Sequence, residues 1–299
     1  MTHQEKNLPA DTCPLCGARD VPLCFERESG ERYHQCGCGM VFLANGTPEC
    51  HYPVDALSEK MRRCGFFWDY RGNKLRSIAQ SHMRWVLSRL RGQELSHPPR
   101  ALSVGCAYGH DLYELKKAGW RVLGVDHDAS FAERARRQHG IEVKTAFFEA
   151  LDLGEDFDLV ILASVLPYLT DIRASLRRLE QLTRPGGCVF ITTRDIDHCD
   201  VAEVLSYPMN VHARQYFTTA GLAALSQAHG FSPVACESFA VRHPFFTRIL
   251  PRLREGRPKR LARGLANLQH AAANALGLDC YRPAQGGHAN QVRFLARKT

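Results

Sequence analysis

Hydrophobic residues follow two different spacings after residue 100. Short apolar runs are separated by segments in which apolar residues recur at helical intervals. The four clearest runs occupy residues 101–104, 121–125, 159–163 and 188–192. Strands that alternate with amphipathic helices are typical of a parallel sheet covered on both faces, so the pattern predicts an α/β fold with a doubly wound sheet. A helix at 219–229, a strand at about 232–241 and a last strand at 291–296 complete this prediction.

The first hundred residues have other patterns. Residues 1–54 are rich in cysteine and poor in helix signals, whereas residues 55–99 carry apolar positions at helical spacing and end in a Ser-His-Pro-Pro breaker. We therefore predict a small cysteine-rich domain at 1–54, one or two connecting helices at 55–99, and the α/β domain at 100–299. A basic helical insertion is expected at about 242–287.

Cysteine usage points to a metal in the first of these domains. Seven of the twelve cysteines lie within the first 64 residues, and a disulfide scaffold does not fit a chain of 299 residues. Two close pairs, Cys13/Cys16 and Cys36/Cys38, could bring four thiolates into the tetrahedron that a structural zinc requires. The second pair is CxC, and four other residues could each replace one ligand: Cys24, His34, Cys50 and His51. Reduced, unligated cysteines are the alternative.

Composition narrows the class of protein. The chain is 44% hydrophobic and 23% charged, and no apolar run approaches the roughly 18 to 20 residues that cross a bilayer. Its first residues are polar and lack the apolar centre of a secretory signal. These features predict a soluble, cytoplasmic protein without a membrane span.

The net charge of +8 is concentrated near the C-terminus. Residues 241–299 contain twelve Lys or Arg residues but only two acids, Glu255 and Asp279. The rest of the chain is therefore close to neutral, which argues against nucleic acid as a partner of the whole protein. The basic segment favours either a solvated helix or contact with an anionic acceptor, with a membrane surface or RNA as weaker alternatives.

A nucleoside site is indicated at the first predicted strand. That strand runs into the small residues Gly105, Ala107 and Gly109 at the start of a helix, where a backbone can approach a ligand closely. Asp126 ends the next strand, 21 residues after Gly105. An acid at this spacing accepts hydrogen bonds from ribose hydroxyls.

These motifs, in this order, carry a family resemblance. The run LSVGCAYG at 102–109, GVD at 124–126, FDLV at 157–160 and LTRPGG at 182–187 resemble the motifs of class I S-adenosylmethionine-dependent methyltransferases. The resemblance implies a Rossmann-like doubly wound sheet preceded by a small Cys-rich zinc domain. Cysteine knuckles followed by GMVFL at 39–43 are also similar to zinc-bearing methyltransferases that act on nucleotide-linked sugars and other small metabolites.

The resemblance also implies roles for individual residues. Gly105, Cys106, Ala107 and Gly109 would wrap the methionine part of S-adenosylmethionine, and Asp126 would hold its ribose. Three residues correspond to the adenine contact: Phe147, Phe148 and Glu149. Either phenylalanine could instead belong to the core. Ala163 and Ser164 would lie beside the reactive methyl group.

Three positions depart from the family pattern. Ser103 stands where an acid is usual, Ala107 replaces the central glycine, and Pro167-Tyr168 replaces the common Glu-His pair. The added methyl of Ala107 falls where backbone and cofactor approach most closely. An acid or base is therefore not transferred to 167–168 from the family.

Candidate groups for the chemistry are few, because methyl transfer relies mainly on orienting the acceptor. His212 precedes the helix at 219–229 and resembles a histidine that lies over the acceptor pocket in related enzymes. A histidine titrates near neutrality and so suits a general base, although a surface role is the alternative. Tyr168 and Tyr216 are further candidates, either catalytic or substrate-shaping.

The sequence thus predicts a methyltransferase for a small biosynthetic metabolite, such as a nucleotide-linked sugar or a carrier-bound intermediate, with an anionic group as one option. Two alternatives stay open. One is an rRNA base methyltransferase, since some of these also begin with a Cys-Pro-Leu-Cys knuckle. The other is a catalytically silent scaffold, which the three departures favour.

Overall fold

The computed structural model describes residues 9–44, 65–151, 153–154, 156–206, 213–241, 281–283 and 291–299. His212, Cys50, His51 and most of the predicted basic insertion lie outside these residues. The described part of the predicted connecting region is one helix, α2 (Gly65–Arg89). The expected doubly wound α/β architecture is confirmed by the sheet and helices that follow it.

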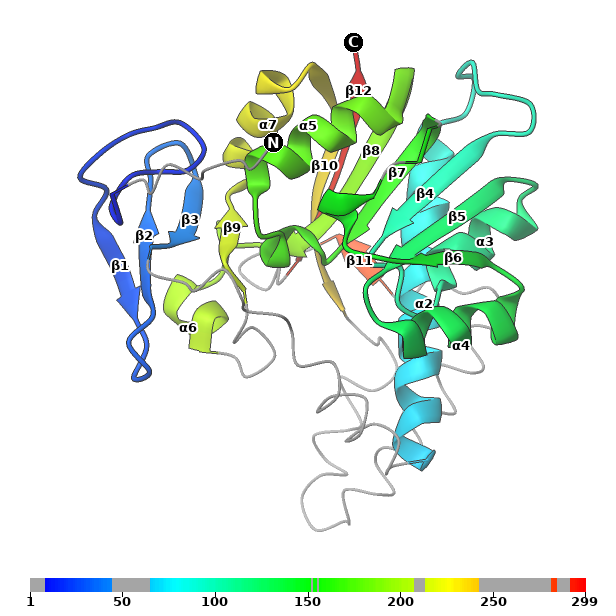
Figure 1. Ribbon diagram of the computed structural model, residues 1–299, viewed down its shortest axis with the longest axis horizontal. Helices are drawn as coiled ribbons and strands as arrows, with labels where there is room; N and C mark the ends of the chain where they lie inside the picture. The colour runs from blue at the N-terminus through cyan, green and yellow to red at the C-terminus, as the bar shows by residue number, and fades with distance from the viewer. Residues whose placement is uncertain are drawn as a thin grey trace.

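An eight-stranded sheet forms the centre of the molecule (Figure 1). Its strands follow the order β11-β10-β12-β8-β7-β4-β5-β6. Their bounds are β4 (Arg100–Val104), β5 (Arg121–Asp126), β6 (Glu142–Thr145), β7 (Phe157–Ala163), β8 (Thr183–Arg194), β10 (Phe231–Val241), β11 (Tyr281–Pro283) and β12 (Gln291–Lys298). The five strands from β8 to β6 are parallel, while β12 is antiparallel to both β8 and β10.

The helices have the end signals that their sequences predict. Their bounds are α3 (His110–Lys117), α4 (Ala129–His139), α5 (Ile172–Leu182), α6 (Val201–Ser206) and α7 (Thr219–Ala228), with 3-10 turns η1 (Phe148–Ala150) and η2 (Leu166–Tyr168). Side chains of Asp128, Asp171 and Thr218 cap α4, α5 and α7 by accepting a backbone N–H of the first turn. Polar residues just before each apolar stripe therefore fix where these helices begin.

Successive residues of the central strands serve opposite faces of the sheet. Leu159 and Ile161 of β7 pack with α2 and α3, whereas Val160 and Leu162 pack with α5 and α7. Figure 1 shows α5 and α7 in front of the sheet and α2 and α3 behind it. This explains the continuous apolar runs in the sequence, because a strand covered on both faces has no solvent-facing side.

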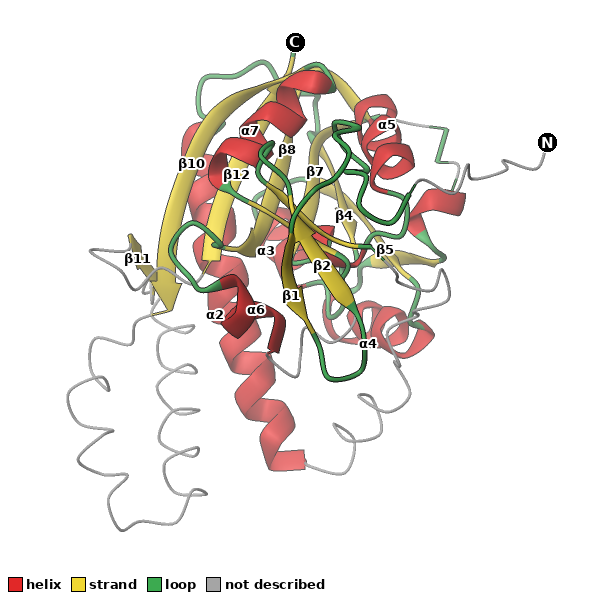
Figure 2. Cartoon of the chain, turned by 90° about the vertical axis from the view of Figure 1, so that its left-hand side faces the viewer, coloured by secondary structure: helices red, strands yellow, loops and turns green. Residues whose placement is uncertain are grey.

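The cysteine-rich segment forms a second, smaller sheet. It contains β1 (Leu23–Glu26), β2 (Arg32–Gln35) and β3 (Met40–Leu43), all antiparallel. Its fourth strand is β9 (Gln215–Phe217), which is distant from β1 to β3 in the sequence and pairs antiparallel with β3. Figure 2 shows β1 and β2 in front of the large sheet. The small sheet is thus completed by the segment between β8 and β10.

Candidate functional site

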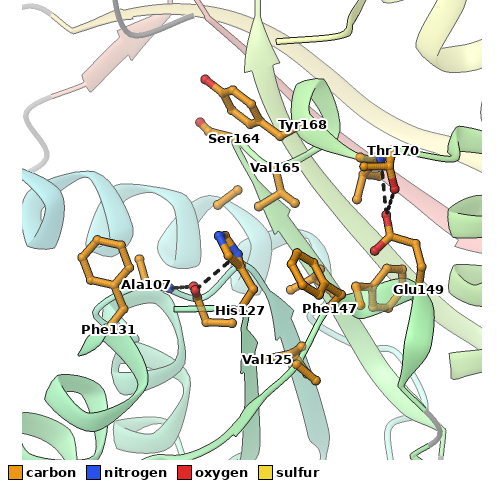
Figure 3. A pocket seen from close by; sticks show the side chains of 17 residues that line it. Ala107, Val125, His127, Phe131, Phe147, Glu149, Ser164, Val165, Tyr168 and Thr170 are labelled. Carbon is orange, nitrogen blue, oxygen red and sulfur yellow. Dashed lines mark hydrogen bonds and ion pairs between the residues drawn. The ribbon is translucent and has the colours of Figure 1, made fainter. Parts of the chain in front are cut away.

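A cavity of about 330 Å³ opens at the carboxyl ends of β4, β5 and β7 (Figure 3). The carboxyl ends of neighbouring parallel strands are the usual ligand position in doubly wound sheets. Most of its lining is apolar, with a few polar groups, as in small-molecule sites. Nine of the predicted site residues line it: Gly105, Ala107, Asp126, Phe147, Phe148, Glu149, Ala163, Ser164 and Tyr168.

The turn after β4 has the close backbone approach that its small residues predict. Gly105 has φ +60°, and a Cβ there would lie 2.6 Å from Cγ2 of Val165 on the loop after β7. Ala107 has φ +45°, a left-handed conformation that favours glycine. The alanine at this family glycine position has therefore kept the backbone conformation of glycine at a cost in strain. Strain of this kind is concentrated at binding sites, and Ser164 in the same cavity has φ +61°.

Asp126 connects the end of β5 to this turn. Its Oδ2 accepts the N–H of Ala107 at 2.8 Å, and its Oδ1 accepts the N–H of Asp128 at 2.9 Å. Burial raises the pKa of Asp126, although the two backbone N–H groups oppose that shift. Each carboxylate oxygen keeps a second lone pair, so the group can still accept a hydroxyl from a ligand in the cavity.

The three residues predicted at the adenine position differ in exposure. Phe148 is buried and belongs to the core, while Phe147 is 50% exposed and its ring lies 5.4 Å from that of His127 at an interplanar angle of 14°. Oε1 of Glu149 accepts the N–H of Thr170 at 3.3 Å. Phe147 thus presents a flat aromatic surface at the cavity, and Glu149 fixes η1 to the loop before α5.

Three other predicted residues lie away from the cavity lining: Cys106, Gly109 and Tyr216. The Cys106 thiol packs beneath the turn, where a Cβ on Gly124 would lie 2.7 Å from Sγ, and burial raises its pKa. A Cβ on Gly109 would lie 3.2 Å from Cβ of Ala135 in α4, so this glycine allows α3 to begin close beside α4. Tyr216 of β9 is buried in a separate apolar cluster, and burial raises its pKa.

Sequence reasoning missed several lining residues, chiefly His127, Phe131, Val165 and Thr170. His127 directly follows the predicted ribose acid, and Phe131 lies one helical turn further on in α4. An aromatic residue in the first helical turn after such an acid, here Phe131, could have been predicted from the sequence to line the cavity. Val165 and Thr170 lie on the loops around η2, whose path toward β4 depends on tertiary packing.

The four predicted cysteine ligands come together in the small sheet. The Sγ atoms of Cys13, Cys16, Cys36 and Cys38 all lie within 4.8 Å of one another. Two of the separations are 3.7 Å, between Cys13 and Cys38, and 3.5 Å, between Cys16 and Cys36. A tetrahedral site with metal–sulfur bonds of about 2.3 Å has sulfur–sulfur edges of about 3.8 Å. The donor set therefore fits a structural zinc ion and leaves no coordination position for substrate.

The described alternatives for these ligands have other partners. The Cys24 thiol donates to the carbonyl of Tyr33 at 3.3 Å, and Nδ1 of His34 lies 2.6 Å from the carbonyl oxygen of Val21. Neither belongs to the cysteine cluster. Within the described residues, the predicted pairs of cysteines are thus the only group arranged to hold a metal ion.

The cysteine knuckles contact the large sheet's helices directly. From α5, Arg173 donates to the carbonyl oxygens of Pro14 (2.5 Å) and Leu15 (3.0 Å) in the first knuckle. In the second knuckle, a Cβ on Gly39 would lie 2.2 Å from Oγ1 of Thr218 and 2.9 Å from Cα of Gly221. Glycine is required at this close contact, where φ is +87°. The cysteine loops and the start of α7 therefore pack as one unit.

The fold is that of a class I S-adenosylmethionine-dependent methyltransferase. The family model described as a methyltransferase domain matches residues 75–235, more than half of the 299-residue chain. The chain belongs to this family. A solved SAM-dependent methyltransferase from Thermotoga maritima has the same fold, with a TM-score of 0.52 and 16% identity over 82% of this chain and 98% of that chain.

Sequence relatives are similar over a shorter stretch. A ubiquinone biosynthesis O-methyltransferase of Rhodopseudomonas palustris (strain BisB18) is 30% identical over 99 residues, which is 31% of this chain and 39% of the relative. The corresponding protein of Bradyrhizobium sp. (strain ORS 278) is 31% identical over the same lengths. The chain thus spans about two fifths of the length of these curated relatives.

Among the helices that the structure describes, none has the length and apolar character needed to cross a membrane.

Proposed function

We propose that this chain transfers the methyl group of S-adenosylmethionine to a small-molecule acceptor. The observation that carries the proposal is the cavity that unites the left-handed turn at Gly105 and Ala107, the Asp126 carboxylate and the Phe147 ring. The family supplies the reaction class, and the O-methyltransferase relatives support a small metabolite as acceptor.

The residues of the cavity suit the three parts of this cofactor. The turn at Gly105 and Ala107 would hold the methionine part, and Asp126 would accept the ribose hydroxyls with its remaining lone pairs. Phe147, which is half exposed, would stack on the adenine. Ala163, Ser164 and Tyr168 would then border the methyl group and the acceptor. A sulfonium supplies an activated methyl group, so these residues chiefly orient the reactants.

We also propose that residues 1–54 form a domain that binds one structural zinc ion through Cys13, Cys16, Cys36 and Cys38. Their sulfur cluster supports this assignment. The side chain of Gln215 in β9 donates a hydrogen bond to the carbonyl oxygen of Leu166 in η2, and β9 completes the small sheet. A metal ion in that sheet would therefore stabilise the wall of the cavity that carries Tyr168. The proposal gives the ion a structural role and no part in the methyl transfer.

Calorimetric titration with S-adenosylhomocysteine tests the cofactor assignment. We expect micromolar binding by the full chain, and binding weaker by about 1–3 kcal/mol in Asp126→Ala, as for a lost hydrogen bond to a charged group. Glu133→Ala, which removes an exposed acid on α4, is the matched control and should bind like the parent. Absence of binding by the parent chain would overturn the proposal in favour of a silent scaffold.

The acceptor class has its own test. Transfer of labelled methyl from S-adenosylmethionine should be detectable with a panel of small hydroxylated, aminated and sugar-nucleotide compounds. Total RNA is the competing acceptor, and filter binding at two salt concentrations measures it separately, because phosphate contacts weaken steeply with salt. Methyl transfer to RNA alone would contradict a small-molecule acceptor while leaving the cofactor assignment intact.

A further inference from the structure

The loop after β8 holds a carboxylate and an imidazole in direct contact. Asp195 is 1% exposed, whereas the His198 side chain is 47% exposed. Nδ1 of His198 lies 3.1 Å from Oδ1 and 3.0 Å from Oδ2 of Asp195. A carboxylate at this distance makes Nδ1 the N–H donor, so the lone pair that accepts a proton is on Nε2.

Other contacts fix this pair in place. Oδ1 of Asp195 also accepts the N–H of Asp197 at 3.1 Å. Oδ2 of Asp197 in turn accepts the N–H of Thr219 at 2.7 Å, which connects the loop to the first turn of α7. Ile196, between the two acids, is buried. The histidine is therefore presented from an anchored loop, as a group that must meet a reacting atom requires.

The loop follows the strand end that is hydrogen-bonded to Ser164, a residue of the cavity lining. The N–H of Ser164 donates to the carbonyl oxygen of Thr192, three residues before Asp195, at 2.9 Å. Tyr168 packs against the apolar cluster that contains Ile196 and Cys199. Because β7 and β8 are parallel, their carboxyl ends open on the same edge of the sheet. Figure 3 shows Ser164 and Tyr168 together at one end of the cavity, apart from Phe131 and Glu149.

We propose that His198 is the general base of the methyl transfer and that Asp195 is its positioning residue. This inference rests on the proposed function, and it names the acceptor group as a hydroxyl of phenol-like acidity. The acceptor oxygen forms a bond to the methyl carbon while the carbon–sulfur bond breaks with its electron pair on sulfur. The hydroxyl proton passes to Nε2, and Asp195 stabilises the resulting imidazolium.

The acceptor class follows from the acidity of the base. A histidine base removes a proton effectively only from a group that is not a much weaker acid than the imidazolium it becomes. Phenols and enols meet that condition, and aliphatic alcohols are too weakly acidic. A neutral amine attacks through its own lone pair and needs no base before the transfer. The dyad is therefore matched to a phenolic or enolic hydroxyl.

Two thiols interact electrostatically with Asp195, and each has further charged neighbours. Cys199, before α6, also interacts with Arg194 at the end of β8 and with Glu203 in α6. Cys236 on β10 also interacts with Asp197. Burial raises the pKa of Cys199, and it raises that of Cys236 to about 11. Both thiols therefore stay protonated near neutral pH, so neither offers a thiolate as a competing base.

Kinetics of the full chain test the proposal, with catechol as acceptor and benzyl alcohol as the weakly acidic comparison. His198→Ala should lower kcat with catechol about 100-fold or more, with the affinity for S-adenosylhomocysteine unchanged. Added imidazole should restore part of that rate, which a merely structural role would not allow. Asp195→Asn should lower kcat and leave KM for catechol within about twofold. His97→Ala is the control and should resemble the parent. His97 is an exposed histidine just before the amino end of β4, whereas the cavity lies at the carboxyl end of that strand.

Each other outcome has a definite meaning. Turnover by His198→Ala within twofold of the parent would overturn the assignment of the base. A parent chain that binds S-adenosylhomocysteine and methylates benzyl alcohol or amines but not catechol would overturn the acceptor class and leave the proposed function standing. A parent chain without cofactor binding would instead remove the proposed function. If His198→Ala does not fold, nitrogen NMR of the parent decides, because a dominant Nε2–H tautomer would contradict the dyad.

Discussion

The two sheets of this protein reach their folds by different routes. The eight-stranded sheet buries apolar residues on both faces, and its strands and helices alternate along the chain. The small sheet has strands of three or four residues and shares its apolar core with α7. A unit of about 40 residues buries too little surface to be stable alone and usually needs a metal or a partner. The small sheet holds a cysteine cluster that fits a metal ion, and it takes β9 from the rest of the chain as a partner strand.

This contrast teaches where each region is vulnerable. The core of the large sheet is shared among many buried apolar residues. The small sheet depends instead on a few specific groups: four thiols, the contact at Gly39 and the two hydrogen bonds from Arg173. Because β9 is connected to η2 through the Gln215 side chain, damage to the small sheet also reaches the Tyr168 side of the cavity.

The largest effect is expected from removal of the cysteine ligands. Cys13→Ser combined with Cys16→Ser should release one metal ion per chain and unfold the small sheet, because structural zinc contributes on the order of 10 kcal/mol to the folding of such units. Metal analysis and a thermal melt followed by circular dichroism measure both changes. Cys236→Ser, at an exposed cysteine on β10, is the control and should keep the metal and the melting temperature. A double variant with its metal and its melt unchanged would refute the zinc assignment.

A smaller effect should follow from filling the contact between the second knuckle and α7. In Gly39→Ala the new Cβ meets Oγ1 of Thr218 and the backbone of Gly221, at a φ that disfavours side chains. We expect a loss of about 2–4 kcal/mol in the free energy of unfolding, measured with urea. Gly37→Ala lies two residues away with open space around its Cβ, so it should change stability by no more than about 0.5 kcal/mol. Equal effects of the two variants would show that the contact does not hold the two sheets together.

The smallest effect concerns strain in the large sheet's own ligand turn. Ala107→Gly should relieve about 1 kcal/mol of strain at φ +45°, partly offset by the greater freedom of glycine in the unfolded chain. Ala129→Gly, in the first turn of α4, should instead destabilise by about 0.5–1 kcal/mol. Urea titration of both variants measures the difference. A greater loss at 107 than at 129 would mean that the left-handed alanine is not strained.

Much of the large sheet could be predicted from the sequence, because each of its strands is an apolar run that is visible within a few consecutive residues. The end of β5 at Asp126 and the turn at Gly105 were placed correctly from spacing alone, since one connection of strand, helix and strand has a nearly fixed length. The cysteine pairs were equally local, and the cluster of their sulfur atoms agrees with the prediction. His212, which lies outside the described residues, remains a prediction.

What the sequence by itself determined is therefore the alternation of strands and helices, the carboxylate at the end of β5 and the two cysteine knuckles. The tertiary structure alone decided that β9 completes the small sheet, that Gly109 serves helix packing, and that Asp195 and His198 meet beside the Tyr168 end of the cavity. The physical reason is the range of the interactions. Periodicity and capping act within one element, but a three-residue strand or a contact between loops acquires its meaning only from partners that are distant in the sequence.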